Sequence, residues 1–469
     1  MTTALTIETD TVRQFLCTLV QVERPQAELP DFDTVMDEVR RLGIGPGRAV
    51  LVALPHGGQF LTVLLALLAR GAVPILLPPS APPSRIERMA QALGADVLVA
   101  PRIQADLAGG EPSHTIARTI QLTFLRDLVT DSYLPGEIIL LTSGTSGVFS
   151  GCLHRVDSLL RNAARHVRSI GQTSADRVLV NLPMHYSYAF VAQVLGTLVS
   201  GGTAVIAGPP FTPAHYERTL QDHQVTVSSL TPTLVESWRR VGRKLPAPLR
   251  ALTVGGGGLD ASSVANVLEH NPNLELYLTY GLTEAGPRVS TLAAHLEPPR
   301  RHSSVGLPLP GVRVHLRTDR PDDHVGELIV ETDTGMLRRV GRRDESACPV
   351  GDGRTSISTG DIFAMDDDGY LFFRSRRPTY VISRGEKVSL RSVCEIAETL
   401  PGIRGAEAWT HESASGDVVF TLDVYCADDS IDEREVRRRL AKVLLRSEQP
   451  AHLLIHPAAQ LGWRKSVAK

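Results

Sequence analysis

A loop built only from glycine, serine and threonine follows an apolar segment in the first third of the sequence. The apolar segment covers residues 138–141, and the loop consists of Thr142, Ser143, Gly144, Thr145, Ser146 and Gly147. Because no bulky side chain intervenes, such a loop can bring backbone N–H groups and hydroxyls close to an anion. No Gly-Lys-Ser/Thr sequence follows, so the loop is not of the Walker type. The composition alone would equally suit a surface turn.

Lysine, the residue that would supply a positioned ammonium group, is scarce. The 469 residues include 49 lysines and arginines against 51 acidic residues, for a formal net charge of −2. The lysines are Lys244, Lys387, Lys442, Lys465 and Lys469. Chemistry that needs an ammonium group must therefore use one of five residues. Without a basic excess, there is no reason to expect a nucleic-acid partner.

Cysteine spacing and hydropathy narrow the class of protein. The five cysteines are odd in number and far apart, so neither a disulfide framework nor a zinc site is predicted. The first ten residues do not resemble a signal peptide. The most apolar stretch, residues 60–77, is interrupted by Arg70, Gly71 and Pro74, which makes it too short to span a bilayer. These features predict a cytoplasmic protein with no membrane partner.

Alternating helices and strands must position the loop. An alternation of helices and strands is predicted for residues 33–100, 154–208 and 215–280. Buried strands joined by helices form parallel sheets. Strands are predicted at 49–54, 72–77, 178–182, 203–207, 225–229, 251–254 and 274–278. Short strands separated by Pro/Gly turns replace the helices between 303 and 374. We expect an α/β fold, with a large N-terminal domain of parallel α/β subdomains plus a β-rich module.

A small α+β unit is predicted after Pro378. Strands are expected at 405–409 and 418–425, followed by a helix that begins at a capping box in residues 430–433, with Ser430 as the N-cap. We therefore predict an N-terminal domain at 1–376, a C-terminal domain at 379–469 and a hinge near 377–378. The acidic run at 366–368 is predicted to form a turn before a strand rather than a metal site.

The loop resembles the phosphate loop of the adenylate-forming (AMP-binding) superfamily of acyl-CoA synthetases, nonribosomal peptide adenylation domains and luciferases. That loop reads [S/T]-G-[S/T]-T-G-x-P-K-G, and residues 143–151 match its first half. Phe149 and Ser150 replace the family's proline and lysine, which removes a point charge near the triphosphate. The resemblance covers roughly residues 33–450. It implies an ATP-dependent, AMP-forming ligase whose small, mobile C-terminal domain acts as a lid.

Further motifs follow in the family's order. Tyr280-Gly281-Leu282-Thr283-Glu284 resembles Y-G-x-T-E and implies that Glu284 is a ligand of Mg²⁺, a hard cation that prefers oxygen ligands. Asp361 resembles the acid that accepts hydrogen bonds from the ATP ribose, which a carboxylate can do twice. The residues thereby implied to bind ATP are Thr142, Ser143, Gly144, Thr145, Ser146, Gly147, Gly256, Gly257, Tyr280, Gly281, Thr283, Asp361 and Arg376.

The resemblance implies three catalytic residues that neutralise the negative charge developing on the phosphates. They are Glu284, which acts through magnesium, Arg376 and a lysine near the C-terminus. Arg376 resembles the arginine that contacts the ribose and phosphate. The tail lysine is assigned to Lys465, with Lys469 as the rival and a protein without a catalytic lysine as the remaining alternative.

The acid pocket is expected around residues 182–189, which resemble the family segment that carries an aromatic gate. His185 and Tyr186 are both candidates for the gate, and ordinary packing is the alternative for each side chain. The expected pocket residues are His185, Tyr186, Tyr188, Gly257 and Gly281. Their aromatic and hydroxyl groups would suit a planar or polar acid better than a long alkyl chain.

The hinge departs from the family pattern, and this keeps several functions open. Pro378 replaces the usual Asp or Lys, and proline removes one of the two soft torsions; Ile382 replaces a lysine a few residues later. The leading hypothesis is transfer of the acyl group to a thiol of coenzyme A or a carrier protein. A second is an amine acceptor, or nitrite as the acid. A third is a degenerate nucleotide-binding regulator.

Overall fold

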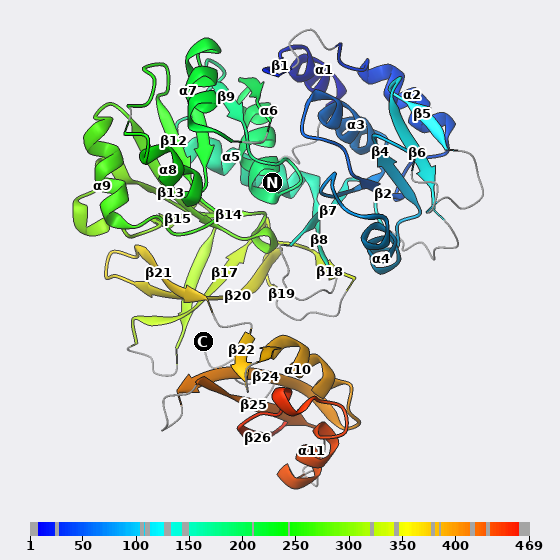
Figure 1. The fold of residues 1–469 in the computed structure, drawn as a ribbon, viewed down its shortest axis with the longest axis vertical. Coiled ribbons are helices and arrows are strands. Elements are labelled where there is room, and N and C mark those ends of the chain that lie inside the picture. Colours follow the sequence, from blue (N-terminus) through cyan, green and yellow to red (C-terminus); the bar gives the residue numbers. More distant parts are fainter. Residues whose placement is uncertain are drawn as a thin grey trace. The chain divides into compact units, whose positions relative to one another are not determined.

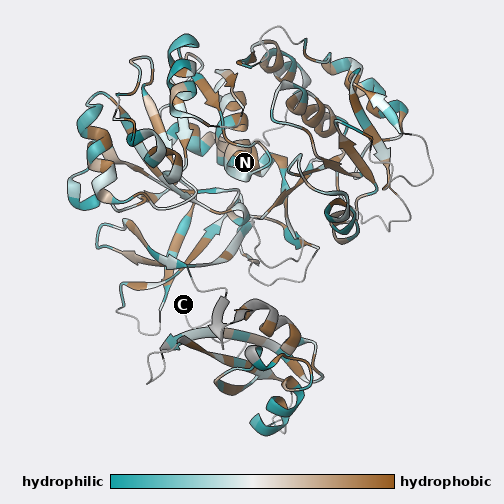
Figure 2. Ribbon diagram, in the orientation of Figure 1, coloured by the Kyte–Doolittle hydropathy of each residue, from teal (hydrophilic) through white to brown (hydrophobic). Residues whose placement is uncertain are grey.

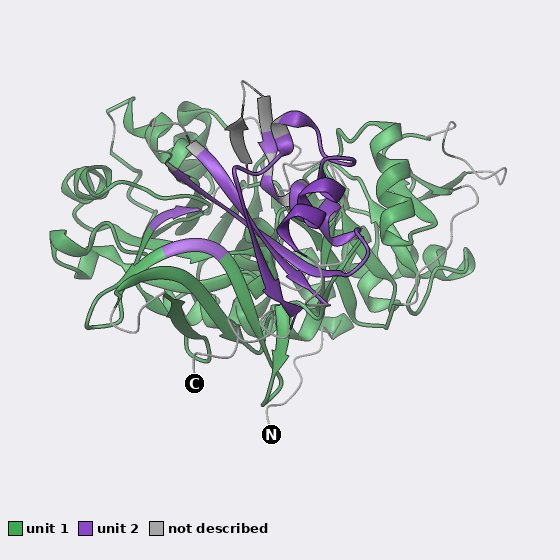
Figure 3. Cartoon of the chain, turned by 90° about the horizontal axis from the view of Figure 1, so that it is seen from below, with its two compact units in different colours: residues 1–359, 363–373 green, residues 360–362, 374–469 purple. Residues whose placement is uncertain are grey.

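The chain divides into two compact units. The computed structural model describes residues 8–23, 28–103, 107, 113–125, 133–142, 150–208, 211–242, 244–318, 323–341, 347–376, 380–383, 386–412, 418–427 and 432–458. The first unit comprises residues 1–359 and 363–373, and the second comprises residues 360–362 and 374–469 (Figure 3). The dividing line therefore passes through two strands, β20 (Arg354–Met365) and β21 (Leu371–Arg376).

An eight-stranded sheet forms around the most apolar part of the sequence. Its order is β18-β8-β7-β3-β2-β4-β6-β5, with β2, β3, β4 and β7 parallel to their neighbours in that group. The strands are β2 (Ala49–Val52), β3 (Val73–Leu76), β4 (Val97–Ala100), β5 (His114–Ile116), β6 (Ile120–Phe124), β7 (Glu137–Leu141), β8 (Gly151–Arg155) and β18 (Arg338–Val340). The helices of this region are α1 (Thr9–Cys17), α2 (Phe32–Arg41), α3 (Gly58–Ala69) and α4 (Pro83–Leu93) (Figure 1).

Helix α3 lies in the middle of this core because almost every position is apolar. It is buried from Gly58 to Leu67 except at Gln59, and it contacts both α1 and α2. Figure 2 shows it as a continuous hydrophobic ribbon. A helix that is apolar on all faces must be enclosed by other elements, and here these are the two amphipathic helices and the sheet.

A second eight-stranded sheet carries most of the candidate site. Its order is β1-β10-β9-β11-β12-β13-β14-β15, parallel from β1 to β13 and antiparallel beyond. The strands are β1 (Val20–Gln21), β9 (Arg177–Val180), β10 (Thr203–Ile206), β11 (Val227–Leu230), β12 (Ala251–Val254), β13 (Glu275–Gly281), β14 (Arg288–Ala293) and β15 (Leu307–Pro308). Its helices are α5 (Val156–Ser169), α6 (Gly196–Ser200), α7 (Pro213–Asp222), α8 (Pro232–Arg239) and α9 (Ala261–His270).

One helix of this region differs from the prediction. The alternation predicted for residues 154–208 calls for a helix between β9 and β10, and this helix begins as a π-helix over Ala189–Leu195 and continues as α6. Gln193, buried in the π-helical turn, donates to Asn181 and accepts from the backbone N–H of Leu182. These bonds tie the helix to the segment after β9. The apolar pattern did not reveal the wider turn, because every residue of the segment is buried and no single face stands out.

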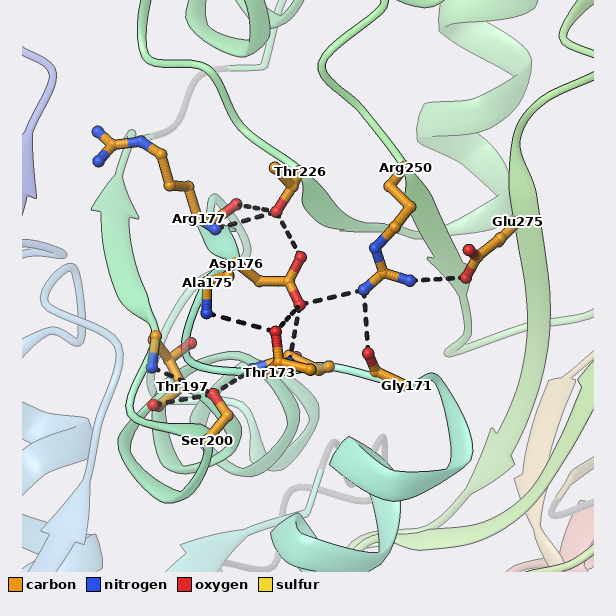
Figure 4. Close-up of polar contacts among 12 residues, drawn as sticks. Gly171, Thr173, Ala175, Asp176, Arg177, Thr197, Ser200, Thr226, Arg250 and Glu275 are labelled. Carbon is orange, nitrogen blue, oxygen red and sulfur yellow. Dashed lines mark hydrogen bonds and ion pairs between the residues drawn. The ribbon is translucent and has the colours of Figure 1, made fainter.

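Ion pairs fasten the amino-terminal ends of the parallel strands (Figure 4). Arg250, just before β12, bonds the carboxylate of Asp176 before β9 at 3.1 Å and that of Glu275 at the start of β13 at 2.7 Å. The hydroxyl of Thr226, before β11, donates to Asp176 at 2.8 Å. Burial alone would raise the pKa of Asp176, but the hydrogen bonds from Thr173, Thr226 and Arg250 lower it.

The β-rich module and the small unit complete the fold. The module pairs β16 (Arg313–Arg317), β17 (Val325–Thr332), β20 and β19 (Ala347–Val350) in that order, with β21 on β20. The small unit contains β22 (Tyr380–Ser383), β23 (Glu386–Ser389), α10 (Leu390–Glu398), β24 (Ile403–Glu412), β25 (Val418–Cys426), α11 (Glu433–Leu440) and β26 (His452–Pro457). Short 3-10 turns lie at Thr283–Ala285, Ala294–Leu296, Pro299–Arg301 and Arg446–Glu448. The predicted α/β class with its β-rich module is confirmed.

Two local predictions can be compared with the structure. The acidic run at 366–368 is a turn, in which the N–H of Gly369 donates to the carbonyl of Asp366. The predicted N-cap of α11 is wrong: the helix begins at Glu433, and its N-cap is Asp432, whose carboxylate accepts from the N–H of Glu435. The reason is that an Asp side chain caps a helix as well as Ser does, and Asp432 lies nearer to the apolar positions of the helix.

Candidate active site

The described candidate residues of the first unit lie where strands end. Thr142 follows β7, and the three aromatic candidates His185, Tyr186 and Tyr188 follow β9. Gly256 and Gly257 follow β12, and Tyr280 and Gly281 are the last residues of β13. In parallel α/β sheets, ligands bind outside the carboxyl ends of the strands. Ser143, Gly144, Thr145, Ser146, Gly147, Pro378, Lys465 and Lys469 lie outside the described residues.

The carboxylate of Glu284 is held by an arginine that no motif indicated. Arg339 Nη2 donates to Glu284 Oε1 at 2.7 Å, and both side chains are largely buried. Arg339 comes from β18, which pairs with β8 and so reaches the turn from a position 55 residues later in the chain. The sequence Arg338-Arg339-Val340 carries no recognisable pattern. Only the strand pairing brings this arginine to the site.

Glu284 does not belong to a preformed cluster of metal ligands in the described part of the chain. No group of three His, Cys, Asp or Glu side chains able to hold a metal is present among the described residues. Mg²⁺ in nucleotide enzymes is commonly held by one or two carboxylates, with phosphates and water as the other ligands. A single carboxylate therefore fits magnesium that arrives with a triphosphate, and it does not fit a preformed metal site.

A buried histidine fixes the turn that carries Glu284. His154 Nε2 lies 2.9 Å from the carbonyl oxygen of Thr283, which can only accept, so Nε2 carries the proton. The hydroxyls of Ser187 and Thr283 lie 2.9 Å apart. Burial lowers the pKa of His154 to about 4, so the imidazole is neutral at pH 7. The backbone before Glu284 is thus anchored to β8 on one side and to the aromatic segment on the other.

Asp361 and Arg376 lie next to each other in the second unit. Arg376 Nε is 3.4 Å from Asp361 Oδ1, across the neighbouring strands β20 and β21. The aspartate is buried, whereas the arginine side chain is 66% exposed. The two residues that the family resemblance assigns to the ribose and phosphate are therefore neighbours, with the arginine open to a ligand or to solvent.

His185 and Tyr186 line a cavity of about 630 Å³ in the first unit. Their rings lie 4.3 Å apart between centroids. Burial, together with the nearby His56, lowers the pKa of His185 to about 4, so this wall of the cavity is neutral at pH 7. The volume falls within the range of small-ligand pockets. Its other lining residues include Phe60, Pro78, Met184, Gln21 and Glu23.

Tyr188 has different neighbours from the other two aromatic candidates. Its hydroxyl lies 3.0 Å from Thr253 Oγ1, which in turn donates to Ser229 Oγ at 2.8 Å. The guanidinium of Arg288 lies 5.2 Å from the centre of its ring. A Cβ on Gly255 would lie 2.4 Å from Thr279 Oγ1 and 3.3 Å from the Tyr188 ring, so a side chain here would force Thr279 to move. Sequence patterns identified Tyr188 but neither Thr253 nor Arg288.

The family is decided by comparison with known proteins. Residues 39–338, well over half of the chain, match the model of the AMP-binding enzymes. The chain belongs to the AMP-binding enzyme family. The predicted ATP-dependent, AMP-forming ligase is confirmed at the level of this family, and the matched range includes the phosphate loop and the Tyr280–Glu284 motif.

Curated relatives are similar over most of this AMP-binding chain. A phenyloxazoline synthase from Mycolicibacterium paratuberculosis is 28% identical over 441 residues, which is 89% of this chain but 36% of the relative. The chain thus spans about a third of that relative's length. A 2-succinylbenzoate–CoA ligase from Bacillus cereus is 25% identical over 380 residues, covering 80% of this chain and 77% of the ligase.

Solved structures of other AMP-binding enzymes share the fold. The o-succinylbenzoate CoA synthetase of Bacillus subtilis, in complex with its acyl-adenylate, aligns with a TM-score of 0.67 at 18% identity over 99% of each chain. The amide bond synthetase McbA of Marinactinospora thermotolerans aligns with a TM-score of 0.64 at 21% identity over 95% of each chain. Within the described residues, no helix is both long and apolar enough to cross a bilayer.

Proposed function

We propose that this protein activates a small aromatic or polar carboxylic acid as acyl-AMP and passes the acyl group to a thiol of coenzyme A or of a carrier protein. The observation that carries this proposal is the ordered placement of the family motifs at the carboxyl ends of the strands, with Glu284 clamped by Arg339. The similarity to a 2-succinylbenzoate–CoA ligase and to a phenyloxazoline synthase supports an aromatic acid and a thiol acceptor.

In the first step, a carboxylate oxygen of the acid attacks the α-phosphorus of ATP. The bond from that phosphorus to pyrophosphate breaks, and no proton needs to move. Two anions must approach each other, so the protein has to place cations around the reacting phosphate. Glu284 would hold Mg²⁺, Arg376 would contact the nucleotide, and Lys465 would supply the ammonium group of the C-terminal tail.

In the second step, the sulfur of the acceptor attacks the acyl carbon, the thiol gives up its proton and AMP leaves. The neutral state of His185 supports an uncharged wall on the side of the cavity that this residue and Tyr186 line. The aromatic rings of His185 and Tyr186 would pack on a planar acid, since aromatic pairs favour tilted or offset contacts.

A second candidate function keeps the adenylate and changes the acceptor or the acid. The substitutions at Ser150, Pro378 and Ile382 favour it, because they fall on the phosphate loop and on the hinge used for thiol transfer. The acceptor would then be an amine, or nitrite would take the place of the carboxylic acid. A third candidate, a regulator that binds nucleotide without turnover, is disfavoured by the presence of Glu284, Asp361 and Arg376.

One experiment separates the three candidates. Pyrophosphate release from ATP is measured with Mg²⁺ over a panel of carboxylic acids and nitrite, followed by addition of coenzyme A or an amine. Acid-dependent release that a thiol completes supports the first function, and completion only by an amine supports the second. No release with any acid supports the regulator.

Two matched variants test the assignment of the ammonium group. Lys465→Ala should reduce the rate of pyrophosphate release about 100-fold or more, because a cation at the developing charge contributes several kcal/mol. Lys469→Ala, four residues later, should leave the rate within about twofold. The reverse pattern would assign the role to Lys469, and two unaffected variants would show that adenylation here needs no lysine.

A further inference from the structure

Arg288 is a buried arginine without a counter-ion among the described residues. It is 2% exposed at the start of β14, directly opposite Gly281 in the β13–β14 pair. No ion pair joins it to a carboxylate in the described parts of the chain, and its Nε and Nη2 atoms have no hydrogen-bond partner there. Burial lowers the pKa of the guanidinium, in accordance with the cost of a charge removed from water.

The backbone of Arg288 is held in place while its side chain is left unpaired. Asn162 accepts from the N–H of Arg288 at 2.9 Å and donates to its carbonyl at 3.0 Å. Asn162 also donates to Thr334 Oγ1, so the amide side chain is itself fixed. The guanidinium faces the Tyr188 ring, and the neighbouring buried His166 is kept neutral because burial and then Arg288 lower its pKa.

Other arginines of this protein show how unusual this arrangement is. Arg250, which is 32% exposed, is paired with both Asp176 and Glu275 (Figure 4). Arg339 is as buried as Arg288 but is paired with Glu284. An uncompensated buried charge costs several kcal/mol, so a protein that keeps one needs an anion to meet it at some stage of its function.

The position of Arg288 indicates which molecule brings that anion. It touches Tyr188 and lies opposite Gly281, two of the predicted acid-pocket residues, and the polar line Ser229–Thr253–Tyr188 runs beside it. Guanidinium groups bind carboxylates in a planar, two-bond geometry. That pairing would weaken the nucleophile if it held the reacting carboxylate. It suits the end of the acid that does not react.

We propose that Arg288 recognises a second anionic group on the acid, so that the preferred substrate is a dianion such as a dicarboxylic acid. This inference rests on the proposed adenylation of a carboxylic acid and names its substrate class. One carboxylate is adenylated, while the other forms a charge-assisted pair with the Nε and Nη2 donors of Arg288. The mutual neutralisation of two buried charges would select such acids over analogues that lack the second charge.

The test compares acids that are matched in shape and differ in charge. Isophthalate is paired with 3-nitrobenzoate, phthalate with 2-nitrobenzoate, and glutarate with its monoamide, glutaramate, in a pyrophosphate-exchange assay. The wild-type protein should prefer the dianion of at least one pair. Arg288→Met should lower kcat/KM for that dianion about 100-fold. It should change kcat/KM for the matched monoanion by less than about threefold. Arg288→Lys keeps the positive charge but cannot form two parallel hydrogen bonds. Its kcat/KM for the dianion should lie between those of the wild type and Arg288→Met.

Thermal unfolding gives a second readout that does not need turnover. Without ligand, Arg288→Met should have a higher Tm than the wild type, because it removes an unpaired buried charge. The dianion should raise the Tm of the wild type and leave that of Arg288→Met unchanged. Arg250→Met is the control: it should lower the Tm and keep the wild-type preference between the acids.

Several results would overturn the proposal. One is a wild-type preference for the monoanionic acids, and another is an equal loss of kcat/KM with every acid in Arg288→Met. A third is a rise in the KM for ATP alone, which would place the guanidinium on the nucleotide. If no acid supports exchange, the proposed adenylation fails. The Tm shifts then decide the binding proposal by themselves: a dianion shift lost in Arg288→Met upholds it, and no shift in the wild type overturns it.

Discussion

Two neighbours hold the carboxylate and the turn of Glu284, which we propose as a magnesium ligand. Arg339 fixes one carboxylate oxygen, and His154 fixes the carbonyl of the residue before it. A carboxylate whose rotamer is already held loses less entropy when it binds a metal. The same pairing means that a cation at Glu284 competes with Arg339 for the carboxylate, so weak binding of the metal alone and tight binding with a triphosphate are expected.

The charge of Glu284 is therefore the first property to test. Glu284→Gln keeps the shape and the ability to accept from Arg339, and it removes the negative charge. We predict that pyrophosphate release at fixed Mg²⁺ falls about 100-fold or more, because a metal ion contributes several kcal/mol to such reactions. Titration with Mg²⁺ measures whether the loss lies in metal affinity. A variant with wild-type rate and magnesium dependence would remove Glu284 from the metal site.

Protonation of His154 should destabilise the fold in mild acid. Its folded pKa of about 4 lies below the ordinary value of 6.5, so the unfolded chain takes up the proton first as the pH falls. Stability is complete above about pH 6.5 and declines as the pH falls towards 4. His154→Gln keeps a donor for Thr283 and does not titrate. Between pH 7 and pH 5, the wild type should lose about 2 kcal/mol more unfolding free energy than the variant.

Urea unfolding at the two pH values provides this comparison. Other buried histidines, His166 and His185, also have lowered pKa values, but they are present in both proteins and cancel in the difference. Parallel declines in stability for wild type and variant would show that His154 is not the group that titrates.

The sequence supplies the candidate site residues that belong to local motifs and gives no sign of those that packing brings next to them. Glu284 and Asp361 stand in short runs of fixed order. Arg339, His154 and Arg288 stand in ordinary strand sequences, and their importance comes from the strand that lies next to theirs. Pairing of β18 with β8, and of β14 with β13, cannot be read from spacing, because it joins segments far apart or through an irregular turn.

At the scale of elements, the β13–β14 connection leaves no room for a side chain at Gly281. A Cβ on Gly281 would lie 2.2 Å from the carbonyl oxygen of Pro287 and 3.0 Å from its carbon, both of which are backbone atoms. The alternating and continuous apolar patterns predicted β9 to β13 well, because each is a short buried run between turns. They gave no sign of the π-helix, and the capping-box pattern placed the N-cap of α11 two residues early.

Gly281→Ala should separate these strands. We predict a loss of about 1–3 kcal/mol in unfolding free energy, since the backbone of Pro287 must move to admit the methyl group. The matched control is Gly45→Ala, where no atom lies within 4 Å of the added Cβ and the φ angle is ordinary. It should be neutral or slightly stabilising. Denaturant unfolding measures both, and equal stabilities would contradict the predicted clash.

At the scale of the whole molecule, the two ends of the strands in the second sheet differ. Ion pairs join the amino-terminal ends, here called the braced edge, and the candidate site residues follow the carboxyl ends. The Asp176–Arg250–Glu275 network joins the amino-terminal ends of three strands, whereas the candidate residues follow the carboxyl ends. The two edges should respond differently to substitution. Changes at the braced edge should alter stability, and changes at the other should alter selectivity and rate.

Arg250→Met tests this division. Asp176 and Glu275 would lose a shared cation, and we predict a loss of about 1–3 kcal/mol in unfolding free energy, less than for a fully buried pair because Arg250 is partly exposed. KM for ATP and for the acid, and kcat, should remain at wild-type values at a temperature where both proteins are folded. A change in KM without a change in stability would refute the division.

The pairing of β1 with β10 has a consequence for how the chain is made and handled. Val20 is synthesised early and its partner Val205 much later. The second sheet therefore has an unpaired edge at β10 until β1 pairs with it. An open edge strand can pair with other molecules. Variants trimmed of the first 22 residues would retain every residue assigned to the chemistry and yet expose β10, and their characteristic failure would be aggregation during expression.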